Sequence, residues 1–291
     1  MVQGASNNFE VVTNEENVTY QWKYLKSDGT WGNTTITGSK TSKISMSATA
    51  ARNGNQYRCV ITDAAGNTTT SDIATLTVVS ITTQPSDSTV TVGETAKFNV
   101  GLSSTNGITY QWKYQLDDGS WANTTVTGSK TATVSISGTV ARNGHVYKCV
   151  ISDATGNTIE TNAVTLTVNK IVISTVPSQS GTLTYTGNAQ SPSWSNYDST
   201  QLTLAGDTSK TNAGTYTATF TPTTNYEWSD GTTTAKSVNW TIGKASGSLS
   251  LNKSSASINI NATTTATVTR SGNGTITVKS SDTTVATATL D

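Results

Sequence analysis

The sequence predicts an all-β protein built from several small modules, and three observations carry this prediction. Thr, Ser, Asn and Gly are abundant, whereas Leu, Glu and Lys, which favour helices, are scarce. The motif TYQWKY occurs at residues 19–24 and again at 109–114, and self-similarity at a fixed spacing marks repeated modules. Apolar and polar residues alternate in short runs between turn-forming stretches, which is the pattern of half-buried strands.

The repeat extends well beyond this motif. Trp31 recurs as Trp121, NTT at 33–35 recurs at 123–125, and ARNGNQYRCVITDAAGN at 51–67 recurs as ARNGHVYKCVISDATGN at 141–157. Trp22 and Trp112 are 90 residues apart, which is the size of one small β domain. Near the start the register slips by one residue, so that Phe9 matches Phe98, as an insertion in a loop would cause.

The second copy shows the expected strands most clearly. Tyr110, Trp112 and Tyr114 alternate with polar residues, so one face of this strand is predicted to be buried and the other wet. Further alternating runs predict strands at Ala96, Phe98 and Val100, at Val134 and Ile136, at Tyr147, Cys149 and Ile151, and at Val164, Leu166 and Val168. Asp118-Gly119, like Asp28-Gly29 in the first copy, predicts a tight hairpin turn with positive φ at the glycine.

Together these residues resemble the immunoglobulin fold, a two-sheet sandwich. Gly93, Ala96, Phe98 and Val100 stand where the family has its second-strand glycine, two apolar residues and first cysteine. Trp112 matches the core Trp of the third strand, and Tyr147-Lys148-Cys149 matches the Tyr-x-Cys of the tyrosine corner, while Asn143 stands where the family often has Asp.

The chain departs from that family at the disulfide. Val11 and Val100 replace the partner cysteines, so the resemblance implies no disulfide within either copy. We expect Cys59 and Cys149 to be small buried apolar residues. A reactive or bridging thiol is the alternative.

Residues 80–92 (SITTQPSDSTVTV) give the second copy an opening strand, but the first copy has too few residues before Phe9 for an equivalent. We expect either an incomplete first sandwich or one completed by another segment of a longer parent protein. An unpaired sheet edge readily accepts a further strand.

The pattern changes near Lys170 but stays β. Tyr185-Thr186-Gly187 and the sequence NAGTY at 212–216 resemble the small β-grasp-like repeats of bacterial surface adhesins and some phage virion proteins. From Gly247 the tail resembles the first half of a bacterial immunoglobulin-like group 2 domain. The predicted domains are therefore 1–79 (opening strand missing), 80–169, 170–244 and a partial domain at 245–291, joined end to end as an elongated chain.

Composition and motifs argue against several classes of function. Eighteen basic and eighteen acidic residues balance, which disfavours a nucleic-acid partner, and no apolar run is long enough for membrane insertion. The only histidine, His145, has Asn55 as its counterpart, so a catalytic role is disfavoured. No metal-binding motif occurs, and we expect neither enzyme activity nor a cofactor. The acids Asp63, Asp153, Asp207 and Asp230 lie in turn-like stretches and are expected to be solvated loop residues.

Aromatic side chains outside the predicted cores are the candidate ligand contacts, because flat rings stack on sugars. Packing against neighbouring strands is the alternative reading for each of them. The candidates are Trp31, Trp121, Trp194, Tyr197 and Trp228.

The expected function is that of structural and adhesive stalk modules, without enzyme activity, on a phage virion (tail or fibre) or a bacterial surface protein. Such modules would mediate display and attachment to a host cell or its glycans. The alternatives are direct carbohydrate-binding adhesin modules and accessory domains of a secreted glycan-degrading enzyme. Expected partners are a cell-surface glycan or protein receptor and other modules of the same parent chain. The expected location is extracellular, at the cell surface or on a virion.

Overall fold

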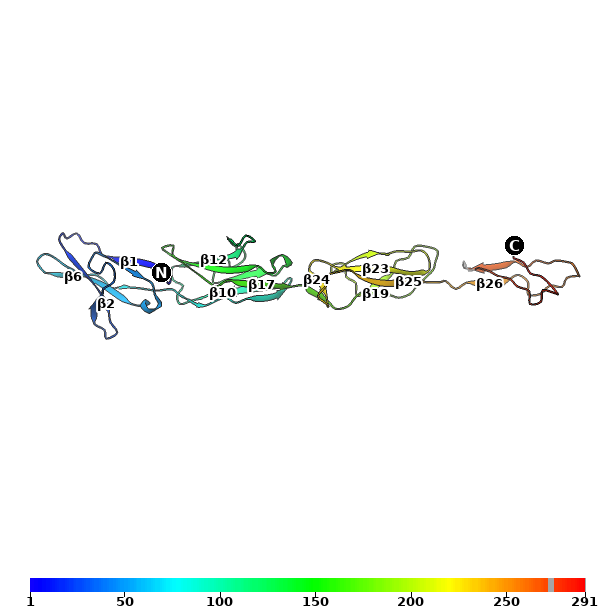
Figure 1. The fold of residues 1–291 in the computed structure, drawn as a ribbon, viewed down its shortest axis with the longest axis horizontal. Coiled ribbons are helices and arrows are strands. Elements are labelled where there is room, and N and C mark those ends of the chain that lie inside the picture. Colours follow the sequence, from blue (N-terminus) through cyan, green and yellow to red (C-terminus); the bar gives the residue numbers. More distant parts are fainter. Residues whose placement is uncertain (272–274, 291) are drawn as a thin grey trace. The chain divides into compact units, whose positions relative to one another are not determined.

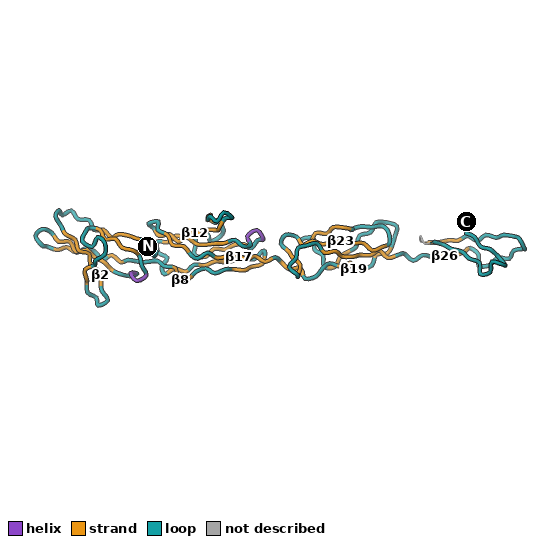
Figure 2. The backbone as a smooth tube through the Cα atoms, in the orientation of Figure 1, coloured by secondary structure: helices purple, strands orange, loops and turns teal. Residues whose placement is uncertain are grey.

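The computed structural model describes residues 1–271 and 275–290 and confirms the all-β prediction. Within these residues the only helical segments are two short 3-10 turns, η1 (Ala50–Arg52) and η2 (Val140–Arg142) (Figure 2). The chain divides into two compact units, Met1–Ile171 and Val172–Asp291. Unit 1 contains the two sequence repeats, called module 1 and module 2 below, and unit 2 contains the rest (Figure 1).

Module 2 is a two-sheet sandwich, as predicted. One sheet has the order β13-β12-β15-β17-β9, with β16 also paired to β15. Its strands are β9 (Ser88–Thr91), β12 (Ile108–Gln115), β13 (Trp121–Asn123), β15 (Val146–Asp153), β16 (Thr158–Glu160) and β17 (Val164–Asn169). Opposite it, β10 (Thr95–Asn99) pairs with β14 (Thr133–Ser137), and β11 (Gly101–Leu102) pairs with β8 (Ile81–Thr83).

Trp112 lies at the centre of the module 2 core. Its ring is fully buried, and its Nε1–H donates to the carbonyl oxygen of Thr131 at 3.0 Å. Because this hydrogen bond is made, burial of the indole does not leave an unpaired N–H donor, which would destabilise the fold. The alternating residues that the sequence predicted to face inward are buried around it, namely Ala96, Phe98, Val100, Val134, Ile136, Tyr147, Cys149, Ile151, Val164, Leu166 and Val168.

Module 1 repeats this arrangement. Its main sheet has the order β3-β2-β5-β6, with β7 also paired to β5, and β1 pairs with β4 on the other side. The strands are β1 (Ser6–Glu10), β2 (Thr19–Leu25), β3 (Trp31–Asn33), β4 (Lys43–Ser47), β5 (Gln56–Thr62), β6 (Thr68–Thr70) and β7 (Ala74–Thr75). Trp22 lies opposite Cys59 as Trp112 lies opposite Cys149. Sequence repeat and structural repeat therefore share one register.

Two glycines in each module are required by the backbone. Gly29 and Gly119 have φ values of +80° and +83°, which confirms the predicted Asp-Gly turns. Gly38 and Gly128 have φ values of +83° and +80°, and a Cβ on either would lie 2.1 Å from a carbonyl oxygen of the next strand. At Gly38 and Gly128 the backbone therefore passes the next strand too closely for any side chain.

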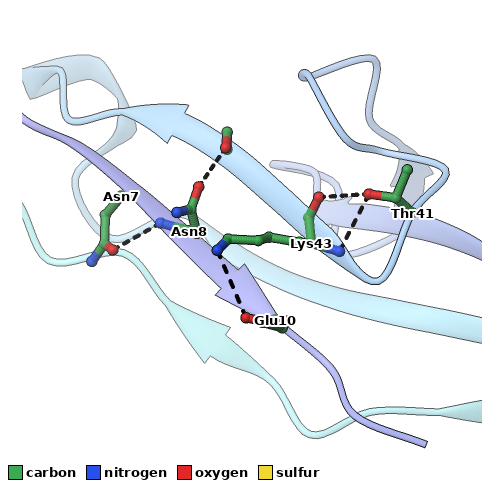
Figure 3. Close-up of polar contacts among 6 residues, drawn as sticks. Asn7, Asn8, Glu10, Thr41 and Lys43 are labelled. Atoms are coloured by element: carbon green, nitrogen blue, oxygen red, sulfur yellow. Dashed lines mark hydrogen bonds and ion pairs between the residues drawn. The ribbon is translucent and has the colours of Figure 1, made fainter.

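The outer face of the β1–β4 pair in module 1 is polar and wet (Figure 3). Lys43 Nζ lies 3.8 Å from Glu10 Oε2, and both side chains are about half exposed. The Thr41 hydroxyl donates to the carbonyl oxygen of Lys43 at 2.8 Å, and Ser45 donates to the side-chain oxygen of Asn8. Exposed pairs of this kind contribute about 0–1 kcal/mol, so the module depends on its buried face.

Unit 2 contains a third core, built mainly by a four-stranded sheet. The order is β20-β25-β23-β22, and two further pairs are β18-β24 and β19-β21. The strands are β18 (Ile171–Ile173), β19 (Ser178–Ser180), β20 (Leu183–Thr184), β21 (Ser193–Ser195), β22 (Leu202–Gly206), β23 (Gly214–Pro222), β24 (Tyr226–Trp228) and β25 (Lys236–Gly243). Phe220, Trp228 and Trp240 are buried at its centre.

The tail of the chain is a β-hairpin with exposed apolar side chains. Strand β26 (Ser248–Leu251) pairs antiparallel with β27 (Val268–Ser271). Leu249 is 61% exposed and Ile260 is 94% exposed. These side chains bury little of the surface that a packed core requires.

Candidate functional site

Modules 1 and 2 meet at a packed joint that includes the first residues of the chain. Val2 forms a parallel bridge with Val79, and Gln3 N–H donates to the Val79 carbonyl oxygen at 2.8 Å. Val79 N–H in turn donates to the Met1 carbonyl oxygen at 2.8 Å. Val2 is fully buried and belongs to the core cluster of module 2, not to that of module 1. An apolar side chain of one module thus completes the core of the next.

The connection between the modules is also fixed by hydrogen bonds. Ser80 N–H donates to the Ser103 hydroxyl at 3.0 Å, and Ser103 N–H donates to the Ser80 carbonyl oxygen at 3.0 Å. Ser103 directly follows β11 of module 2. The residues that join the two modules therefore pair with module 2 and do not form a free linker.

Asp153 contributes a carboxylate to this joint. Its Oδ2 accepts the backbone N–H of Val2 at 3.1 Å, and its Oδ1 accepts the N–H groups of Thr155 and Asn157 and the Thr155 hydroxyl. The expectation that Asp153 is a solvated loop residue is wrong, because only 9% of its surface is exposed. Val2, at the start of module 1, lies against this carboxylate.

Burial of the Asp153 carboxylate and its hydrogen bonds act on its pKa in opposite directions. Burial raises the pKa because it disfavours the charged form, whereas the hydrogen bonds from Thr155, Val2 and Asn157 stabilise that form. The hydrogen bonds prevail, and the pKa of Asp153 lies well below its usual range.

Asp63 is the counterpart of Asp153 in module 1 and serves as an internal comparison. Its Oδ1 accepts the N–H groups of Ala65 and Asn67, as in the second copy. Asp63 is half-buried, the loop residues after it are exposed, and it has no partner from another module among the described residues. The loop geometry is thus intrinsic to the repeat, and the contact with Val2 is added by the joint.

A second candidate site is the outer face of the main sheet, where each module places a Trp beside a cation. In module 1 the Arg58 guanidinium lies over the Trp31 ring, 4.2 Å from its centroid. In module 2 Lys148 Nζ lies 4.4 Å from the Trp121 centroid and 2.6 Å from Glu160 Oε2. Both Trp rings are half-buried. In each module the cation thus lies over one face of the Trp ring, and in module 2 Glu160 pairs with that cation.

The other three aromatic candidates lie in unit 2 and pack into its core. Trp194 meets Phe220 edge-on with centroids 4.9 Å apart, and Tyr197 meets the same ring at 5.5 Å. Trp228 is only 1% exposed, and its Nε1–H donates to the Thr234 carbonyl oxygen at 2.9 Å. Its ring therefore presents no face for stacking, and the structure does not bring it together with Trp31 and Trp121.

A hollow of about 300 Å³ lies beside the tyrosine corner of module 2. Tyr114, Asn123, Arg142 and His145 are among its lining residues. The Tyr114 and His145 rings are stacked, with centroids 6.1 Å apart and an interplanar angle of 10°. Arg142 Nη1 donates to the Ser137 carbonyl oxygen at 2.9 Å. His145 thus has a packing role against Tyr114.

Both thiols are buried inside their modules. Cys59 and Cys149 are free, with no exposed surface. Burial raises the pKa of Cys149 to about 12 and also raises that of Cys59. This agrees with the expectation of small apolar core residues, because a protonated thiol is a poor nucleophile.

In the part of the chain that the structure describes, no group of three His, Cys, Asp or Glu side chains is placed to bind a metal ion. No helix in residues 1–271 and 275–290 is long and apolar enough to cross a membrane.

Comparison with known proteins gives structural neighbours only. No protein-family model matches the chain, and no curated protein matches it. Extracellular domains 3–5 of Drosophila OTK are 15% identical over 84% of this chain and 93% of that one, with a TM-score of 0.26. An I-band fragment of titin is 14% identical over 84% and 94%, with a TM-score of 0.37. The tandem Ig repeats of Dlar are 18% identical over 58% and 91%, with a TM-score of 0.27.

Sequence reasoning missed the parts that Val2 and Asp153 play in the joint. Val2 lies near the start of the given sequence and belongs to no periodic apolar pattern. Asp153 recurs as Asp63 in the same loop, so nothing in its own repeat distinguishes it. The direct passage from residues 74–79 to Ile81 without a Gly-Ser linker predicts a short and fairly stiff joint, but it does not tell which other residues form it.

Proposed function

We propose that this chain is a structural and adhesive protein without enzyme activity, whose modules act as a spacer and offer ligand-contact faces. The observation that supports the proposal best is the joint, where Val2 of module 1 lies in the core of module 2 and bonds Asp153. Domains that only carry binding sites work equally well on flexible tethers. A spacer gains from joints that keep neighbouring modules in a fixed relation.

We further propose display on a phage virion or a bacterial surface, with attachment to a host cell or its glycans. This rests on the resemblance of residues 170–244 to β-grasp-like repeats of adhesins and virion proteins, and of residues 245–291 to part of a bacterial immunoglobulin-like group 2 domain. The abundance of Thr, Ser and Asn suits strands whose outer faces are exposed to water. A parent reading frame with a catalytic domain would favour the accessory role in a glycan-degrading enzyme instead.

Backbone NMR relaxation of the full chain tests the spacer role. We expect modules 1 and 2 to tumble with one rotational correlation time, and Asp153→Ala to give them separate correlation times. Asp63→Ala removes the matching carboxylate outside the joint and serves as the control. Independent tumbling of the two modules in the unaltered chain contradicts the spacer role.

Direct carbohydrate binding is the second candidate function, and the sheet face of module 2 favours it. Trp121, Lys148 and Glu160 combine a ring face with a donor and an acceptor for sugar hydroxyls. A glycan array probed with the full chain should give hits that Trp121→Ala abolishes. Thr70→Ala, at the position in module 1 that matches Glu160, should leave them unchanged. An array without signal for the unaltered chain speaks against this function.

A further inference from the structure

The outer face of the main sheet in module 1 carries two neighbouring cations without an acid. Lys23 on β2 stands directly opposite Arg58 on β5 in the strand register, so both side chains project from the same face. Both residues are half-buried. Like charges at directly opposite positions of a sheet repel each other, and partly buried charges are screened less by salt. This part of the face therefore carries unbalanced positive charge.

Module 2 has the same pair of cations but balances it. Lys113 stands opposite Lys148 in the register, and Lys148 Nζ lies 2.6 Å from Glu160 Oε2. Glu160 lies on β16, at the position where β6 of module 1 has Thr70. The repeat thus places a carboxylate beside the cations in one copy and a hydroxyl in the other.

The Arg58 guanidinium has hydrogen-bonding capacity that module 1 does not use. Its Nε is buried and has no hydrogen-bond partner. Among the described residues, neither Arg58 nor Lys23 forms an ion pair. The Trp31 ring, with its centroid 4.2 Å from Arg58 Cζ, supplies a cation–π contact but no acceptor oxygen. Since a guanidinium binds a carboxylate through two parallel N–H donors, a carboxylate is the group that would balance this face.

The side chains around the two cations fit a protein partner. Leu25 and Val60 are each two positions from one of the cations on the same strand, so they lie on the same face. Both are half-buried, and neither belongs to the core cluster of module 1. Arg and Trp are the residue types that contribute most to protein–protein binding, and apolar neighbours help to exclude water from such a contact.

We propose that this face of module 1 docks a protein segment rich in Asp or Glu, with one carboxylate bound between Arg58 and Lys23. Charge complementarity identifies the partner, because the two cations lack an acidic partner within the described part of the chain. Module 2 does not share the site, since its Glu160 already pairs with Lys148. The inference goes beyond the spacer and glycan roles and does not depend on them.

Two short synthetic peptides test the docking against the full chain. In the first Glu alternates with Thr, and in the second Gln replaces every Glu. We expect the Glu peptide to bind saturably, with NMR shifts of the Arg58 Nε–H and Trp31 Nε1–H signals, whereas the Gln peptide should cause no such shifts. In Arg58→Gln the Glu peptide should bind at least about tenfold more weakly.

Exchange of the acid between the modules gives the matched variants. Thr70 is exposed, so its replacement leaves the core intact. Thr70→Glu gives module 1 the carboxylate of module 2 and should weaken binding of the Glu peptide at least about tenfold. Thr70→Gln adds the same bulk without the charge and should keep binding within about twofold. Glu160→Thr frees Lys148 and should create a second site, seen as shifts of Trp121 Nε1–H.

Several outcomes contradict the proposal. Equal binding of the Glu and Gln peptides, unchanged binding in Thr70→Glu, shifts confined to other parts of the chain, or a Glu160→Thr chain without a site on module 2 would each overturn it. A uronic acid oligosaccharide that shifts the same signals and binds more tightly than the Glu peptide would also overturn it, because the partner would then be an acidic saccharide.

Discussion

The backbone N–H of Val2 donates to Oδ2 of Asp153 at 3.1 Å, which joins two residues 151 positions apart and in different modules. The donor is buried, so water is not an alternative partner. A buried N–H that loses its acceptor costs about 1–3 kcal/mol.

Asp153→Ala should therefore lower the free energy of unfolding of unit 1 by about 1–3 kcal/mol. Asp63→Ala removes the same residue from an exposed loop, and we expect a smaller loss there. Urea unfolding of both variants, followed by Trp fluorescence, measures the difference. Equal losses in the two variants would show that the bond across the joint contributes nothing beyond the loop.

The joint should also be sensitive to acid. The pKa of Asp153 is lower in the folded chain than its unfolded value of about 3.9, so its contribution to stability is complete above that pH. The contribution is lost as the pH falls through the range between the two values. Stability of the unaltered chain should drop between about pH 5 and 2, and Asp153→Asn should flatten that drop.

Thermal unfolding at several pH values checks this expectation. Asp63→Asn is the matched comparison. The pKa of Asp63 is also lowered, by its hydrogen bonds with Asn67, but this carboxylate lies outside the joint. A curve for Asp153→Asn that runs parallel to that of the unaltered chain over the whole range would exclude a linkage between this carboxylate and folding.

The sequence predicts the core of each module well, because the relevant pattern is local. Trp112 and Cys149 alternate with polar residues on their own strands, and this alternation alone places both inside. Burial of Asp153 depends on a neighbouring module, so no local pattern reports it. Trp228 was expected to lie outside the predicted cores, but it ends a strand that packs on a core formed by distant residues.

Glycine substitutions should separate backbone strain from a steric clash. Gly119 and Gly128 have nearly the same positive φ, but only Gly128 lies against a carbonyl oxygen. Gly119→Ala should cost about 1–2 kcal/mol from the left-handed backbone alone. Gly128→Ala should cost clearly more, because its Cβ would lie 2.1 Å from the Thr133 oxygen. Chemical unfolding of the two variants gives the comparison, and equal costs would mean that the loop simply moves aside.

The two thiols should be inert in the folded chain. Burial raises the pKa of Cys149 to about 12, so almost no thiolate exists at neutral pH. We expect a thiol reagent at pH 8 to modify neither cysteine in native protein and both in 6 M guanidinium, as counted by mass spectrometry. Fast modification of the native protein would place a cysteine at the surface, in conflict with the structure.

Because Val2 lies inside module 2, the boundary between the repeats in sequence is not a boundary in packing. A gene fragment that begins at Ser80 would encode module 2 with an empty space of one valine side chain. Recombination that moved this repeat into another protein would leave the same space. The repeat is therefore portable only together with a neighbour that supplies an apolar residue at that place.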